Sequence, residues 1–135
     1  MARALDLMES DLAPSVQVLY VEDNVANVQL MQRIFMERPQ LELLIATDGT
    51  SARELAKTAD PQLVFVDVNL PDMSGEELII CLQNDLGEMT PPLVVLSADA
   101  MSSTIERLRS LGIAEYITKP YDVQHLFDVI DAFCK

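Results

Sequence analysis

Short apolar runs alternate with amphipathic stretches along the chain, and this alternation limits the fold more than any other feature of the sequence. The apolar runs cover residues 16–21, 41–46, 63–66, 93–96 and 113–117. Each is four to six residues long and nearly free of polar residues, as is typical of strands buried on both faces of a parallel sheet. We therefore predict five strands, with the second at an edge because Glu42 interrupts its apolar pattern.

The stretches between the runs carry helical patterns and helix-end signals. We predict helices over about residues 24–38, 50–59 and 74–86, a fourth around Ile105 and Leu108, and a fifth from Asp122 to the C-terminus. Ser74 and Glu77 have the spacing of a capping box, and Gly112 is a candidate left-handed residue after the fourth helix.

Five strands that alternate with five helices predict one α/β domain, a doubly wound parallel sheet with helices on both faces. Right-handed crossovers leave few topologies, and a chain of 135 residues fits the strand order 2-1-3-4-5. In such a sheet, ligands bind outside the carboxyl ends of the strands.

Charge and composition exclude several functional classes. The net charge is −13, which argues against direct binding to nucleic acid or to anionic lipid. No apolar run approaches the roughly 20 residues that cross a bilayer, so we expect a cytoplasmic protein without direct membrane contact. Cys81 and Cys134 do not have the spacing of a metal site, and we expect reduced thiols.

Polar residues follow the strands at the predicted ligand edge. Glu22 and Asp23 end the first strand, Asp67 the third and Ser97 the fourth, and Lys119 comes soon after the fifth. We expect three acids, a hydroxyl and an ammonium to converge there. Clustered carboxylates repel one another unless they bind protons or a cation, and a hard oxygen-ligated ion such as Mg²⁺ suits them. A metal and an ammonium beside one carboxylate favour phosphoryl transfer to that carboxylate.

Each of these residues alone also has a simpler interpretation. An acid after a strand is usually a helix cap, and Asp67 with Asn69 and Pro71 could be ordinary turn chemistry. Ser97 alone is more often a cap, and Lys119 alone a solvated surface charge. Their joint placement on one edge favours a functional site.

Four segments together resemble the receiver domain of bacterial response regulators, over about residues 16–134: Val21-Glu22-Asp23-Asn24, Val66 to Gly75, Leu96-Ser97-Ala98 and Tyr116 to Pro120. The resemblance implies a flavodoxin-like receiver fold and an Asp67 that accepts a phosphoryl group from phosphohistidine. It also implies Mg²⁺ held by Asp23, Asp67 and the carbonyl of Asn69, with Glu22 acting through water.

The resemblance assigns further roles around that site. Lys119 is expected to contact the phosphoryl oxygens and to precede a cis peptide bond to Pro120. Ser97 and Tyr116 resemble the switch residues that respond to phosphorylation at a surface of the fourth helix, fifth strand and fifth helix. Asn69 and Asp99 lie two residues beyond Asp67 and Ser97, where side chains influence the lifetime of the phosphoryl group.

The expected partner is a histidine kinase or a histidine phosphotransfer protein. We expect residues 1–15 to be an N-terminal extension or linker and residues 16–135 to be the receiver domain. The sequence leaves open a stand-alone regulator or a receiver from a hybrid sensor kinase, and it leaves dimerisation through the last helices undetermined. In either case we expect a phosphoacceptor that promotes its own phosphorylation and dephosphorylation, not an enzyme for an external substrate.

Two other functions compete with this interpretation. A phosphatase of the haloacid-dehalogenase type also uses an aspartate after a strand, but Asn69 occupies the position of its general acid. A receiver-like interaction module that works without phosphorylation is the second alternative, although such modules typically lose the acidic set that this chain keeps.

Overall fold

A computed structural model describes residues 16–134, and the expected extension at residues 1–15 lies outside them. The strands are β1 (Val16–Val21), β2 (Leu41–Ala46), β3 (Leu63–Asp67), β4 (Leu93–Ser97) and β5 (Glu115–Thr118). The helices are α2 (Val25–Phe35), α3 (Gly49–Ala59), α4 (Gly75–Leu86), α5 (Ser102–Arg109) and α6 (Val123–Phe133), with a short 3-10 turn at Gly87–Met89.

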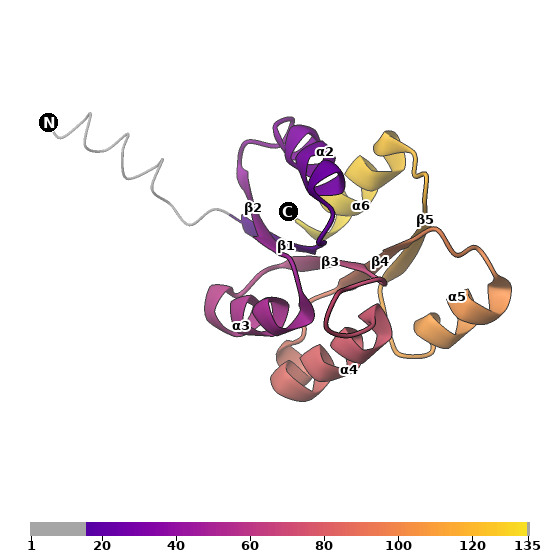
Figure 1. Cartoon of the computed structure of the whole chain (residues 1–135). Coiled ribbons are helices and arrows are strands. Elements are labelled where there is room, and N and C mark those ends of the chain that lie inside the picture. The colour runs from indigo at the N-terminus through magenta and orange to yellow at the C-terminus, as the bar shows by residue number, and fades with distance from the viewer. Residues whose placement is uncertain (1–15, 135) are drawn as a thin grey trace, which may run out of the picture.

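The five strands form one parallel sheet in the order β2-β1-β3-β4-β5, which confirms the predicted topology. Helices α2 and α6 cover one face, and α3, α4 and α5 cover the other (Figure 1). Strand β2 lies at an edge, as the exposed Glu42 predicted. Among residues 16–134, no helix is both long and apolar enough to span a membrane.

Two apolar cores, one on each face of the sheet, explain why the strands are nearly continuous apolar runs in the sequence. On β1, Val18 and Tyr20 pack towards α2 and α6, while Leu19 and Val21 pack towards α3, α4 and α5. All four of these side chains are almost completely buried. Because the sheet is covered on both faces, both sets of side chains must be apolar, and the strand carries no polar alternation.

Most of the predicted helix ends are confirmed. Ser74 and Glu77 form the capping box that begins α4, and the side chain of Asp122 accepts a hydrogen bond from Gln124 N at the start of α6. Gly112 has a φ of +91°, in the left-handed region that favours glycine.

Two boundaries differ from the prediction. Helix α2 ends at Phe35 and not near Arg38, because the amides of Glu37 and Arg38 bond three residues back in a tightened turn. Pro39 disfavours a helical conformation of the residue before it, which shortens the helix further. Strand β5 begins at Glu115 and not at residue 113, because Gly112 and the two residues after it complete the turn from α5.

Candidate functional site

Glu22 lies directly after β1 and turns inward, so that it is only 1% exposed. Its Oε1 accepts hydrogen bonds from the Tyr20 hydroxyl at 3.0 Å and from Asn27 Nδ2 at 3.1 Å. Its Oε2 accepts one from Asn24 N at 3.2 Å, at the start of α2. A buried carboxylate is therefore held in one orientation by three donors from β1 and α2.

Asp67 is the last residue of β3 and is 6% exposed. Its Oδ1 accepts a hydrogen bond from Asn69 N at 2.8 Å, and its Oδ2 accepts one from Lys119 Nζ at 3.1 Å. The same Nζ lies 3.6 Å from Glu22 Oε1. Strands β1, β3 and β5 therefore bring two buried carboxylates and one ammonium together at the predicted edge of the sheet.

The electrostatics of this group are unbalanced, because two carboxylates share a single ammonium. Burial raises the pKa of Glu22, the neighbouring Asp67 raises it further, and Lys119 opposes both effects. Burial also raises the pKa of the Tyr20 hydroxyl, and the carboxylate of Glu22 adds to that shift. The site thus favours an additional positive charge, either a proton or a cation.

Asp23 differs from this pair in burial, because it is exposed. Among residues 16–134, no three acidic, histidine or cysteine side chains are arranged to hold a metal ion. Glu22 and Asp67 are brought together through Lys119, and the role of Asp23 as a ligand stays a prediction. Glu22 is thus buried, whereas the next residue in the chain is exposed.

The donor set nevertheless fits a hard cation such as Mg²⁺. Glu22 and Asp67 supply carboxylate oxygens in a net negative setting, and oxygen ligands of this kind suit Mg²⁺. Asp23 is adjacent to Glu22 in the chain and is exposed to solvent.

Ser97 and Tyr116 are linked through one residue of the β4–α5 loop. Ser97 ends β4 and is 2% exposed, and its Oγ accepts a hydrogen bond from Asp99 N at 3.0 Å. The buried Tyr116 donates its hydroxyl to the carbonyl of Asp99 at 2.6 Å. The Asp99 carboxylate bonds Met101 N and the Thr104 hydroxyl at the start of α5, and these donors hold its pKa below the usual range. The two expected switch residues are thus joined to α5.

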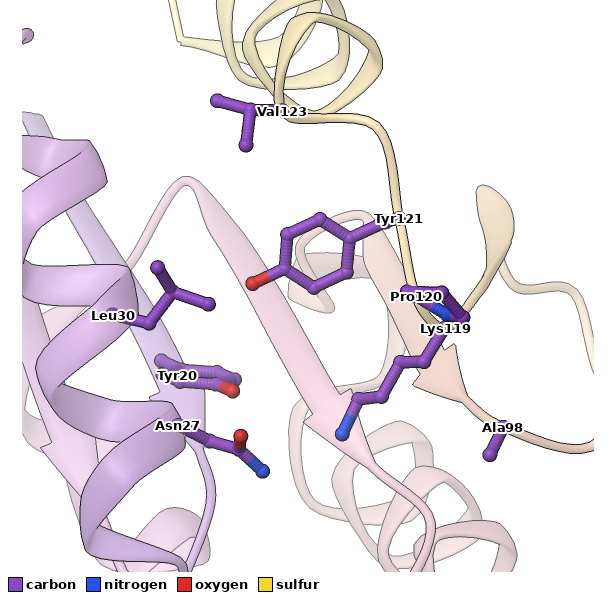
Figure 2. Close-up of a pocket in the computed structure, with 8 residues that line it drawn as sticks. All are labelled: Tyr20, Asn27, Leu30, Ala98, Lys119, Pro120, Tyr121 and Val123. Atoms are coloured by element: carbon purple, nitrogen blue, oxygen red, sulfur yellow. The ribbon is translucent and has the colours of Figure 1, made fainter.

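A pocket of about 390 Å³ opens beside the carboxylate pair, between α2 and the loop before α6. Its lining comprises Tyr20, Asn27, Leu30, Ala98, Lys119, Pro120, Tyr121 and Val123. Figure 2 shows the Lys119 side chain extending towards Asn27 and the Tyr121 hydroxyl pointing towards Tyr20 and Leu30. The peptide bond between Lys119 and Pro120 is cis, as the sequence predicted.

Sequence reasoning missed Tyr20 and Asn27, which both donate to Glu22. A tyrosine inside an otherwise aliphatic strand is a usable signal, because a buried hydroxyl needs a hydrogen-bond partner. Asn27 carries no comparable signal, since a polar residue in the first turn of a helix is ordinary.

Comparison with known proteins places this geometry in a family. Residues 18–131 match the family model described as response regulator receiver domain. The polar-differentiation response regulator DivK of Brucella ovis is 33% identical over 116 residues, which are 86% of this chain and 94% of DivK.

Two solved structures share the fold at lower identity. The receiver domain of a putative LuxO repressor from Vibrio parahaemolyticus has a TM-score of 0.82 at 21% identity, over 90% of this chain and 91% of its own. The receiver domain of a Pseudomonas aeruginosa sensor histidine kinase has a TM-score of 0.79 at 20% identity, over 90% of this chain and 98% of its own. That second structure contains a magnesium ion coordinated in its active-site cleft. The chain described here belongs to the response regulator receiver domain family of two-component signalling.

Proposed function

We propose that this receiver domain works as a phosphoacceptor, with Asp67 taking the phosphoryl group from a phosphohistidine of a partner protein. The observation that carries the proposal is the position of the Asp67 carboxylate, buried between an ammonium and a backbone amide. In the transfer, the P–N bond of the phosphohistidine breaks and a P–O bond forms to Asp67, which gives an aspartyl phosphate. The imidazole keeps the bonding electrons and takes up a proton.

The neighbouring residues support this transfer by position and charge. Lys119 already contacts Asp67 Oδ2 and can neutralise charge that develops on the phosphoryl oxygens. Glu22, Asp23, Asp67 and the carbonyl of Asn69 would hold Mg²⁺. When bound, Mg²⁺ supplies further neutralisation of the phosphoryl oxygens.

The response to phosphorylation would pass through Ser97 and Tyr116. An aspartyl phosphate adds strong acceptor oxygens, and the Ser97 hydroxyl, whose oxygen accepts a hydrogen bond from Asp99 N, would turn to donate its proton to the phosphoryl group. Tyr116 bonds the carbonyl of that same Asp99. The surface formed by α5, β5 and α6 would therefore shift between two arrangements.

The proposed partners are a histidine kinase or a histidine phosphotransfer protein in the cytoplasm. The chain itself would promote its own phosphorylation and dephosphorylation. Asn69 and Asp99 would set the lifetime of the phosphoryl group. They would do so by orienting the water that hydrolyses the aspartyl phosphate. In the structure the Asp99 carboxylate accepts hydrogen bonds at the start of α5, so it would orient water only after the β4–α5 loop rearranges.

The test adds acetyl phosphate with Mg²⁺ and follows intact mass, and adds beryllofluoride with Mg²⁺ and follows NMR shifts. Wild type should gain the mass of one phosphoryl group, and Asp67→Asn should not. Asp131→Asn, which removes an exposed carboxylate on α6, is the control and should gain the same mass as wild type. Beryllofluoride should shift the resonances of Ser97 and Tyr116. A wild-type chain that gains no mass would overturn the proposal and favour an interaction module that works without phosphorylation.

A further inference from the structure

Asp72 joins the loop after the phosphoacceptor strand to the start of a helix that is remote in sequence. Its Oδ1 accepts a hydrogen bond from Gly49 N at 2.8 Å. Its Oδ2 accepts two more, from Thr50 N at 3.0 Å and from the Thr50 hydroxyl at 2.9 Å. The donors hold the pKa of Asp72 below its usual range, the Gly49 amide contributing most.

Helix α3 already has a cap of its own. The side chain of Asp48 accepts a hydrogen bond from Ser51 N at 2.7 Å, as an N-cap residue does. Two carboxylates therefore accept hydrogen bonds from the first three amides of α3. Asp48 is the residue directly before the helix, whereas Asp72 comes from a distant loop. This arrangement makes Asp72 a tether between α3 and the β3–α4 loop, in addition to any capping effect.

The tethered loop, residues 68–74, leads directly to the phosphoacceptor. Asn69 and Ser74 form an isolated antiparallel bridge, so the residues between them make the tip of a closed turn, and Asp72 lies in that tip. At the base of the turn, Asn69 N donates to Asp67 Oδ1 at 2.8 Å. A shift of the tip would therefore be transmitted to Asn69.

The tip also packs against the start of α3. A Cβ atom added at Gly49 would come within 2.5 Å of Met73 Sδ, so Met73 occupies the space that glycine leaves. The hydrogen bonds that Asp72 accepts and this contact of Met73 fix the same part of the loop against the same turn of helix.

We propose that Asp72 is a positioning residue for the cation site, holding the β3–α4 loop so that Asn69 is correctly placed beside Asp67. The inference rests on the proposed function, since it assumes that Mg²⁺ binds at Asp67 and at the carbonyl of Asn69. Groups that orient metal ligands from outside the coordination shell typically change metal affinity by roughly 10- to 100-fold. We expect Asp72→Ala to weaken Mg²⁺ binding by about tenfold, at the lower end of that range.

Asp48→Ala is the matched control, because it removes a carboxylate from the same helix end without touching the loop. Both variants should lose stability by a similar amount, as expected for a lost helix cap. Only Asp72→Ala should lose Mg²⁺ affinity. Asp72→Asn keeps one acceptor oxygen and should fall between wild type and Asp72→Ala, which provides a milder variant if alanine prevents folding.

The experiment is an NMR titration with Mg²⁺ alone on wild type, Asp67→Asn and the three variants, with folding checked by thermal unfolding. A wild-type chain that does not bind Mg²⁺ would refute the proposed function itself. If wild type binds and Asp72→Ala binds equally well, the proposed function stands and the tether is refuted. Equal weakening in Asp48→Ala and Asp72→Ala would also refute it, because the effect would then come from capping α3.

Discussion

Lys119 Nζ lies 3.1 Å from Asp67 Oδ2 and supplies the positive charge that this carboxylate, the proposed phosphoacceptor, contacts in the structure. The same ammonium is 3.6 Å from Glu22, so one cation serves two buried acids. The pair keeps an excess of negative charge after this interaction. Lys119 therefore opposes the binding of a second cation while it favours the arrival of a phosphoryl group.

These two effects give Lys119→Met opposite consequences for the two ligands. Removing the ammonium should raise Mg²⁺ affinity about fivefold, which corresponds to roughly 1 kcal/mol of lost repulsion between like charges. Phosphoryl uptake from acetyl phosphate should slow by about 100-fold or more, because a charge-stabilising donor is lost. NMR titration and intact-mass kinetics measure the two quantities.

Lys57→Met is the control for this variant. Lys57 is a half-exposed ammonium on α3, 4.0 Å from Asp85, and its removal should change neither quantity. Weaker Mg²⁺ binding in Lys119→Met would show that the ammonium organises the acids and does not compete with the cation.

Asp67→Asn should make the Mg²⁺-free protein more stable. The substitution removes one of two adjacent buried carboxylates, and relieving such a site commonly raises the free energy of unfolding by about 1 kcal/mol. Mg²⁺ should stabilise wild type and have little effect on the variant, because a ligand stabilises only the state that binds it. Urea unfolding with and without Mg²⁺ measures both effects.

Asp131→Asn separates this effect from a general loss of negative charge. Asp131 is bonded by Arg38 through Nε and Nη2, both at 2.9 Å. Its removal breaks an ion pair and should not increase stability. A stabilisation of the same size in both variants would attribute the effect to net charge and not to the site.

The fold could be predicted from the sequence because both faces of a parallel sheet must be apolar. That requirement makes each strand a largely apolar run, and the first four runs mark their strands to within one residue. The carboxyl ends of parallel strands share one edge, so the meeting of Asp67, Glu22 and Lys119 followed from the strand assignment alone.

Side-chain direction and distant contacts could not be predicted in the same way. The sequence does not determine that Glu22 is buried while Asp23 is exposed, since the burial of Glu22 depends on the donors that Tyr20 and the start of α2 present. The bond from Gly49 to Asp72 joins residues 23 positions apart, and no local pattern marks such a pair. Local sequence patterns determine strands and helix caps, whereas these contacts depend on how helices, strands and loops distant in sequence pack together.

The ion pair between Arg53 and Asp85 should make stability depend on pH in the acid range. Arg53 Nε and Nη2 each lie 2.8 Å from an Asp85 oxygen, and the guanidinium lowers the pKa of Asp85. The folded chain therefore keeps Asp85 ionised at pH values where the unfolded chain already binds a proton. This contribution to stability is complete above the usual aspartate pKa of about 4 and is lost as the pH falls through the lowered folded value.

Urea unfolding of wild type and Asp85→Asn across this pH range tests whether the ion pair causes the pH dependence of stability. The variant should be less stable at neutral pH, and the difference should shrink as the solution is acidified. The double variant Arg53→Gln/Asp85→Asn completes a mutant cycle, and the coupling energy should fall with the same pH dependence. A difference that stays constant with pH would show that packing, not charge, links the two side chains.

Gly75→Ala should destabilise the domain although alanine is the better helix former. A Cβ at Gly75 would lie 2.6 Å from Val68 Cα and 3.0 Å from the carbonyl oxygen of Asp67. Both are backbone atoms at the base of the β3–α4 loop, so the strain cannot be relieved by a side-chain rotation. Overpacking of this kind costs about 2 to 3 kcal/mol. It should also weaken Mg²⁺ binding, because the loop that carries Asn69 must move.

Gly87→Ala provides the matched comparison for this prediction. Gly87 has a φ of +56°, but a Cβ there would meet nothing within 4 Å. With a ψ of −126° its backbone lies outside the left-handed helical region, in a conformation that only glycine adopts readily, so the substitution should cost about 1 to 3 kcal/mol of stability. Because this strain lies far from Asn69 in the chain, Mg²⁺ affinity should stay unchanged. If Gly75→Ala leaves Mg²⁺ affinity as unchanged as Gly87→Ala does, then α4 can move away from β3, and the loop that supports Asp67 is less tightly held than these contacts indicate.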